Sequence, residues 1–242
     1  MKEITWDGIM HAALNMPGIK VDRDSFLIKT FAPYGENPQL LVNSRPSEIY
    51  SEKVIHKVAS NIISNHTTKV TAISAAAGIP GGFAMFGTIP ADMAQFYWHY
   101  LVMAQKLAYV YGWPDLRNEQ NELGEGAQQI LTVFMGIGFG LEAAHGAIRK
   151  IAIEAAKHWA KKLPQMTLTK TFWYPIIKNI AKFIGVKITK DSVGKAAGKI
   201  IPFIGAVFSG GLTLITFKPM ANRLNKELQT TALLRSTFPE KD

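Results

Sequence analysis

The sequence predicts an all-α fold, a single compact multi-helix domain. Apolar residues recur at helical spacing along most of the chain, and no segment shows the sustained alternation of a half-buried strand. With 242 residues, 48% of them hydrophobic, the chain is long enough to bury a sizeable core. We expect roughly eight to ten helices, with two apolar helical hairpins broken by Gly and Pro, residues 78–90 and 200–217, packed at the centre.

Proline, glycine and capping residues mark the helices of the first quarter of the chain. Pro17 and Gly18 end the first helix, Asp24 can cap the second, and Pro33 stops it. A loop bounded by Pro38 and Pro46 precedes the third. The predicted helices cover residues 6–15, 24–32 and 47–64.

A stretch of 22 residues without a charge, 70–91, follows this third helix. Its length would suit a membrane-spanning helix. Pro80 and Pro90, however, each remove a backbone donor and stop or kink a helix. We therefore expect helix up to Ala77 and then a kinked apolar hairpin, either buried in the helical core or dipped into a bilayer.

The second half of the chain predicts further helices. Pro90 is well placed to open a helix, Asp92 lies in its first turn, and Gly112 and Pro114 close it. The predicted helices cover residues 91–111, 123–139, 142–163 and 219–234. We divide the chain into an N-terminal helical extension, a helical domain and a frayed tail, at residues 1–50, 51–235 and 236–242.

Several short motifs in residues 51–228 resemble those of the EcsC family. Their shared feature is Pro, Gly and Asp at fixed offsets inside apolar sequence. The residues that carry the resemblance are Gly78, Pro80, Gly81, Gly82, Pro90, Asp92, Tyr111, Gly112, Pro202 and Gly205. The resemblance implies a helical protein tied to the cytoplasmic face of the membrane, in a family named after an operon that also encodes an ABC transporter. It implies no established catalytic residue.

The helix predicted over 91–111 carries a narrow polar stripe on an otherwise apolar cylinder. Its members lie within about 60° of the helix surface: Asp92, Gln95, His99 and Lys106. In one interpretation Asp92 and His99 form a buried pair for proton transfer or ligand binding. In the other, Asp92 caps the helix and His99 bonds to another helix.

Metal and cofactor sites find little support in the sequence. The chain has no Cys, and no two of its six His stand at the helical spacing that joins ligands on one face. Glu142 and His145 match one half of a di-metal carboxylate motif whose second half is missing. No P-loop, nucleophile elbow or dinucleotide fingerprint is present. We expect no metal and no cofactor.

The net charge of +9 is concentrated in one region. Residues 149–218 hold 13 Lys/Arg against Glu154 and Asp191, a balance of +11. Aromatic and aliphatic residues alternate with lysines there, as in a helix that rests in a membrane interface. The predicted membrane- or anion-binding residues are Lys161, Lys162, Lys170, Phe172, Trp173, Tyr174, Lys178, Lys182, Phe183 and Lys187. The alternative is an ordinary amphipathic helix whose apolar side faces the core.

These patterns favour a non-enzymatic protein at the cytoplasmic leaflet, an accessory or regulator of a membrane component such as a transporter or GTPase. We expect an anionic phospholipid surface as its partner and a peripheral location at the inner face of the cytoplasmic membrane. Nucleic acid is disfavoured, because the basic region has twelve Lys and one Arg, whereas base readers rely on Arg. The alternatives are a soluble module that binds a GTPase or transporter ATPase, and a hydrolase or lyase that uses Asp92 and His99.

Overall fold

A computed structural model describes residues 5–35, 37–77, 85–86, 89–157, 173–193 and 210–236. Side chains are described within these ranges except at 73–77, 85–86, 89–93, 154–157, 173, 187–193, 210–213 and 233–236. The all-α prediction is confirmed: the described part of the chain folds into nine α-helices packed as a single domain. Two two-residue strands, which no pattern in the sequence predicted, also occur there.

Nine helices follow one another along the described part of the chain. They are α1 (Trp6–Leu14), α2 (Arg23–Phe31), α3 (Pro46–Ile49), α4 (Glu52–Ala77), α5 (Ala91–Val110), α6 (Glu125–Gly138), α7 (Glu142–Lys157), α8 (Trp173–Val193) and α9 (Gly210–Ser236). Two 3₁₀ turns, η1 (Ala32–Tyr34) and η2 (Pro38–Val42), lie between α2 and α3. The strands β1 (Met85–Phe86) and β2 (Ile89–Pro90) pair antiparallel just before α5.

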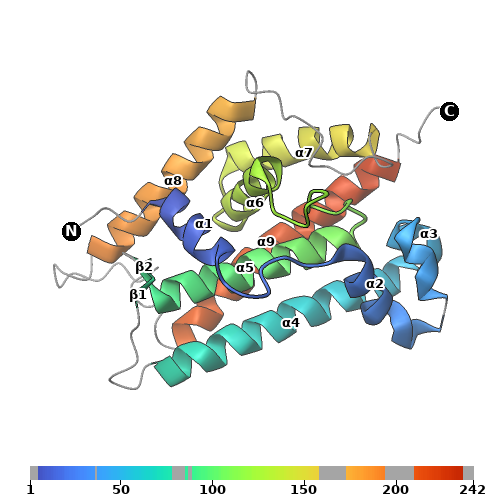
Figure 1. Ribbon diagram of the computed structural model, residues 1–242, viewed down its shortest axis with the longest axis horizontal. Helices are drawn as coiled ribbons and strands as arrows, with labels where there is room; N and C mark the ends of the chain where they lie inside the picture. The colour runs from blue at the N-terminus through green and yellow to red at the C-terminus, as the bar shows by residue number, and fades with distance from the viewer. Residues whose placement is uncertain are drawn as a thin grey trace.

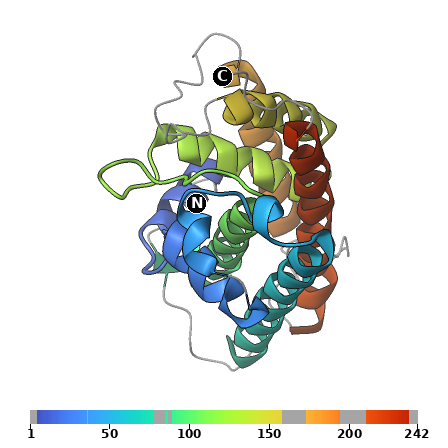
Figure 2. The same ribbon diagram turned by 90° about the vertical axis from the view of Figure 1, so that its right-hand side faces the viewer.

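Helix α5 runs through the middle of the molecule, and α1, α2, α4, α6 and α9 all pack against it (Figure 1). The long helices α4 and α9 lie side by side and run in opposite directions, as both views show (Figures 1 and 2). Helix α8 packs on α1, α6 and α7 at the other side of α5. One continuous buried cluster extends from Trp6 to Leu228 and includes residues of α1 and α2.

The apolar character of α5 explains its central place. Between Ala94 and Val110 almost every side chain is buried. Its buried Gln105 is paired: the side-chain amide donates to the carbonyl of Ile19 and accepts from the amide of Val21. The helix ends at Val110, one residue before the predicted end, and Gly112 follows it in the left-handed conformation (φ 76°) that glycine adopts without strain.

Two helix starts differ from those predicted. Asp22, not Asp24, caps α2, because its side chain accepts the Ser25 amide while the Asp24 carboxylate pairs with Arg23. The helix predicted to start at Pro219 begins at Gly210, and Pro219 lies inside α9 on its exposed side. Residues 210–217 therefore belong to α9.

The helix predicted over residues 47–64 is two helices. Tyr50 adopts an extended conformation between them, with its ring stacked on Phe31 of α2 at 4.5 Å between centroids. This aromatic contact holds the chain at the turn, after which α4 runs unbroken to Ala77.

Most of the two predicted apolar hairpins lies outside the described residues. Of the first hairpin, only β1 and β2 are described, in the register Met85 with Pro90 and Phe86 with Ile89. Of the second, only the portion inside α9 is described. Among the helices of the described ranges, none combines the length and apolarity needed to cross a bilayer.

Candidate functional site

The basic, aromatic region that the sequence singled out is described in part, as helix α8. Lys161, Lys162, Lys170 and Phe172 lie outside the described residues, as do the side chains of Trp173 and Lys187. The remaining predicted residues all lie on the outer side of α8: Tyr174 (50% exposed), Lys178, Lys182 and Phe183 (41% exposed). Val186, which was not among the predicted residues, is 44% exposed on the same helix.

The opposite side of α8 anchors the helix to the bundle. Ile177, Ile180 and Ile184 are buried there. Gly136 of α6 allows Ile180 to approach closely, since a Cβ on Gly136 would lie 2.8 Å from the Ile180 Cγ2 atom. One face of helix α8 therefore packs against the core, and the other face exposes both lysines and large apolar side chains.

A second exposed apolar pair lies at the beginning of α9. Leu214 and Ile215 are 45% and 61% exposed. The end of α8 and the beginning of α9 both lie on the left-hand side of the molecule in Figure 1. Large exposed apolar side chains are not confined to these two helices, since Leu40 and Val42 of η2 are also exposed.

His99 lies in a buried chain of basic groups between α4 and α5. The Nζ atom of Lys106 lies 3.1 Å from His66 Nε2, and His66 Nδ1 lies 3.4 Å from His99 Nδ1. An ammonium group can only donate, so His66 accepts at Nε2 and carries its proton on Nδ1. That proton is donated to His99 Nδ1, which leaves the His99 proton on Nε2.

The imidazoles of His66 and His99 are both held neutral. Burial, together with the positive charges of Lys106 and Lys69, lowers the pKa of His66 to about 3 and that of His99 to about 4. Burial and Lys69 also lower the pKa of Lys106. Within the described residues no carboxylate joins this network, so it differs from an acid-oriented imidazole.

The proposed pairing of His99 with Asp92 has no described geometry, because the Asp92 side chain lies outside the described set. The sequence could not indicate the His66–His99 contact, since the two residues lie 33 positions apart on different helices. No group of three or more metal-ligating side chains occurs among the described residues.

The half-motif Glu142/His145 is not assembled. Glu142 is exposed, whereas the His145 imidazole lies 2.7 Å from the Glu227 carboxylate of α9. Arg149 donates to the other oxygen of the same carboxylate at 2.9 Å. Glu227 therefore ties α7 to α9 and has both oxygens occupied.

The structural-motif residues that gave the family resemblance are described only in part. Gly78, Pro80, Gly81, Gly82, Pro202 and Gly205 lie outside the described residues. Pro90 ends β2, and the backbone of Asp92 lies in the first turn of α5. Tyr111 is buried and donates its hydroxyl hydrogen to Asn225 of α9 at 2.9 Å.

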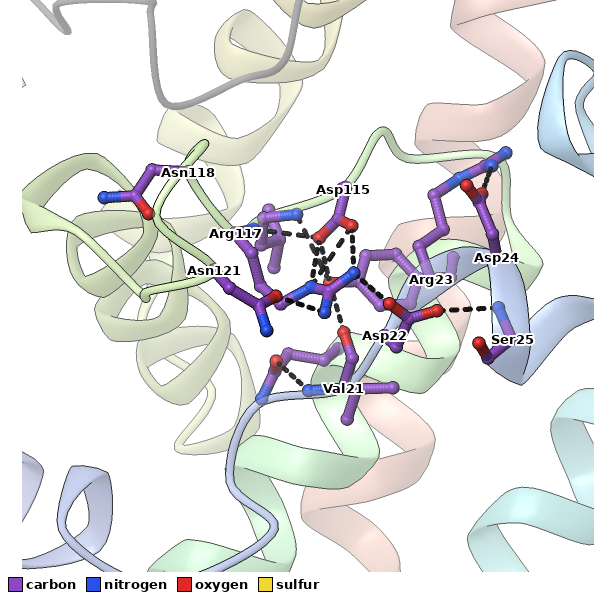
Figure 3. Close-up of polar contacts among 12 residues, drawn as sticks. Val21, Asp22, Arg23, Asp24, Ser25, Asp115, Arg117, Asn118 and Asn121 are labelled. Atoms are coloured by element: carbon purple, nitrogen blue, oxygen red, sulfur yellow. Dashed lines mark hydrogen bonds and ion pairs between the residues drawn. The ribbon is translucent and has the colours of Figure 1, made fainter.

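Arg117 forms an ionic cluster that no sequence motif indicated (Figure 3). Its guanidinium donates to both oxygens of Asp115 and also reaches Asp22 and Asn121. Hydrogen bonding to Asp115 raises the pKa of Arg117. The cluster joins the loop after α5 to the start of α2, and because its charges are mutually paired we assign it a structural role.

Comparisons with protein-family models, with curated proteins and with solved structures find no match to this chain. The resemblance to the EcsC family therefore stays a prediction from the motifs alone.

Proposed function

We propose that the protein acts at a membrane surface and binds anionic phospholipid through the outer face of α8, where it would assist or regulate a membrane component. The observation that carries the proposal is the composition of that face. Tyr174, Lys178, Lys182 and Val186 follow one another at near-helical intervals and are all exposed.

The face has the geometry of an interfacial helix. At 100° per residue its exposed side chains span about half of the helix circumference, and the buried isoleucines occupy the other half. Lysine stems can lie along an apolar surface while their ammonium groups reach phosphate, and tyrosine favours the headgroup level. Bundle packing leaves this half of α8 uncovered by the other described helices.

The charge on α8 supports an anionic rather than a neutral surface. The segment 173–193 contains Lys178, Lys182, Lys187 and Lys190 against Asp191 alone. Each lysine near an anionic leaflet contributes about 1 kcal/mol of attraction, and the attraction falls off within a Debye length. The exposed apolar side chains would add a contribution that salt does not screen.

Co-sedimentation with vesicles tests the proposal. We expect the protein to bind vesicles of phosphatidylcholine mixed with phosphatidylglycerol, and to bind pure phosphatidylcholine weakly. The double variant Lys178→Glu/Lys182→Glu should weaken binding by about tenfold or more, because two attractive charges become repulsive. Tyr174→Ser/Val186→Ser should reduce the part of binding that survives high salt.

A matched control has the same change in net charge on another surface. Lys29 of α2 and Lys53 in the first turn of α4 are exposed, and both helix segments lie across the molecule from α8 (Figure 1). Lys29→Glu/Lys53→Glu should bind vesicles nearly as wild type does. Equal losses in the two double variants, or binding that ignores lipid charge, would refute the α8 surface and favour a soluble partner-binding module.

A further inference from the structure

A polar groove of about 330 Å³ lies between the antiparallel helices α4 and α9. Helix α4 contributes hydroxyl side chains, among them Ser60, Ser64 and Thr67, and α9 contributes Lys218, Asn222 and Asn225. Each set recurs at intervals of three or four residues and so lies on one face of its helix, and both sets line the groove. The groove is separate from the outer face of α8, since no residue of α8 lines it.

Thr67 supplies a hydroxyl that has no partner in the described structure. The residue is 4% exposed, and its Oγ1 atom is buried without a hydrogen bond. A buried hydroxyl that lacks a partner destabilises a protein, so retaining one in the wall of a groove points to a bound group that would satisfy it.

Asn225 is oriented by a neighbour outside the groove. Its side-chain Oδ1 accepts the Tyr111 hydroxyl hydrogen at 2.9 Å. Burial raises the pKa of Tyr111 to about 12, so this hydroxyl remains a donor at neutral pH. With its oxygen occupied, Asn225 has its two amide hydrogens left to donate in the groove that it lines.

The groove favours a negatively charged ligand. Lys218 is an exposed cation on its wall, and no Asp or Glu is among its lining residues. We propose that the groove binds a phosphate ester of a small polyol, with the phosphate held by Lys218 and the Asn225 amide. The hydroxyls of Ser60, Ser64 and Thr67 would bond to the hydroxyls of the polyol.

The size of the groove fits this ligand class. A volume of about 330 Å³ lies at the small end of ligand pockets, which begin near 300 Å³. Apolar atoms of Ile63 and Leu214 are also present on its walls and can contact the carbon skeleton. The same chemistry occurs in a soluble polyol phosphate and in the headgroup of a phospholipid.

Calorimetric titration with glycerol 3-phosphate tests the proposal on the intact protein, with glycerol and inorganic phosphate as partial ligands. We expect glycerol 3-phosphate to bind more tightly than either. Lys218→Gln should weaken its binding by about tenfold or more, since a charge-assisted contact is lost. Lys226→Gln, an exposed lysine of α9 outside the groove, is the matched control and should bind as wild type does.

Thr67→Val separates a ligand contact from a structural role. It keeps the shape of the side chain and removes only the unpaired hydroxyl. We expect binding to weaken about fivefold while the urea midpoint of unfolding stays the same or rises. A lower midpoint would overturn the proposal, as would the absence of binding at millimolar glycerol 3-phosphate or equal affinities in the Lys218 and Lys226 variants.

A second experiment, with vesicles, distinguishes a phospholipid headgroup from a soluble polyol phosphate as the ligand. If the groove holds a headgroup, Lys218→Gln should reduce binding to phosphatidylglycerol vesicles; if it holds a soluble ester, only the titration should change. Either result supports the groove. The titration contains no membrane, so its outcome is independent of the α8 variants and of the proposed function.

Discussion

His66 of α4 and His99 of α5 face each other through their Nδ1 atoms at 3.4 Å, and both rings are buried. Lys106 donates to His66, and His66 donates to His99. These hydrogen bonds form together only when both rings are neutral and each carries its single proton on the nitrogen assigned above. The contact stabilises the packing of α4 on α5 as long as both rings stay unprotonated.

The histidine pair predicts that stability falls as the pH is lowered from about 6.5, the pKa of an unfolded histidine. Between that value and the folded pKa values of about 3 and 4, the unfolded state binds more protons than the folded state. The free energy of unfolding should therefore decrease by up to about 1.4 kcal/mol per pH unit for each histidine. Urea unfolding at a series of pH values measures this slope.

The double variant His66→Gln/His99→Gln should lose the slope between about pH 6.5 and 5, where few carboxylates titrate. His56→Gln, which changes an exposed histidine of the same helix, should keep it. A wild-type slope in the double variant would show that these two rings are not the groups that become protonated on unfolding.

The close contact between Gly138 and Tyr100 predicts that adding one methyl group at position 138 strongly lowers stability. A Cβ on Gly138 would lie 2.8 Å from the Tyr100 Cζ atom and closer still to its hydroxyl, which donates to the Phe134 carbonyl at 3.0 Å. Gly138→Ala should therefore displace a fully buried ring and lower the free energy of unfolding by about 1–3 kcal/mol. The urea midpoint measures the loss.

Gly146 of α7 provides the matched control, because nothing lies within 4 Å of a Cβ at that position. Gly146→Ala should leave stability unchanged or raise it by up to about 1 kcal/mol, since alanine is the better helix former. Equal losses at the two positions would contradict the close contact with Tyr100.

The Arg117 cluster predicts that charge alone cannot replace the guanidinium. Arg117→Ala leaves the Asp22 and Asp115 carboxylates without their cation and should lower the free energy of unfolding by about 2–4 kcal/mol. Arg117→Lys keeps the charge but loses the forked geometry, so it should recover only part of the loss. Full recovery in the lysine variant would mean that charge alone accounts for the stabilisation.

The contacts of Glu227 between α7 and α9 predict a smaller loss of stability. Its carboxylate is 8% exposed and accepts from His145 and Arg149. Glu227→Gln keeps the size of the side chain and removes the charge, and should lower the free energy of unfolding by about 1–2 kcal/mol. Glu142→Gln, at an exposed position of α7, should have no effect by the same denaturation measurement.

Much of the helical framework could be predicted because its signals are local. Pro90 and Gly112 bracket α5, and the structure places the mostly apolar helix between them in the core. The break at Tyr50 was missed because it depends on the stacked ring of Phe31, 19 positions earlier. Pro219 was taken for a helix start, whereas the chain tolerates it on the exposed side of α9.

The side-chain clusters escaped prediction because their members come from distant parts of the chain. Asp22 and Arg117 are 95 positions apart, and His145 and Glu227 are 82 apart. Helical spacing relates residues only within one helix. It could therefore group His99 with Lys106, but it could not bring His66 to them.

The place of α9 has a consequence for synthesis of the protein. Phe217, Leu224 and Leu228 of this helix are buried, and α9 packs against α4, α5, α6 and α7. While the ribosome is still translating α9, the apolar surfaces that it will cover stay open to water. Nascent chains of this protein should therefore be prone to aggregate and to recruit chaperones until α9 emerges.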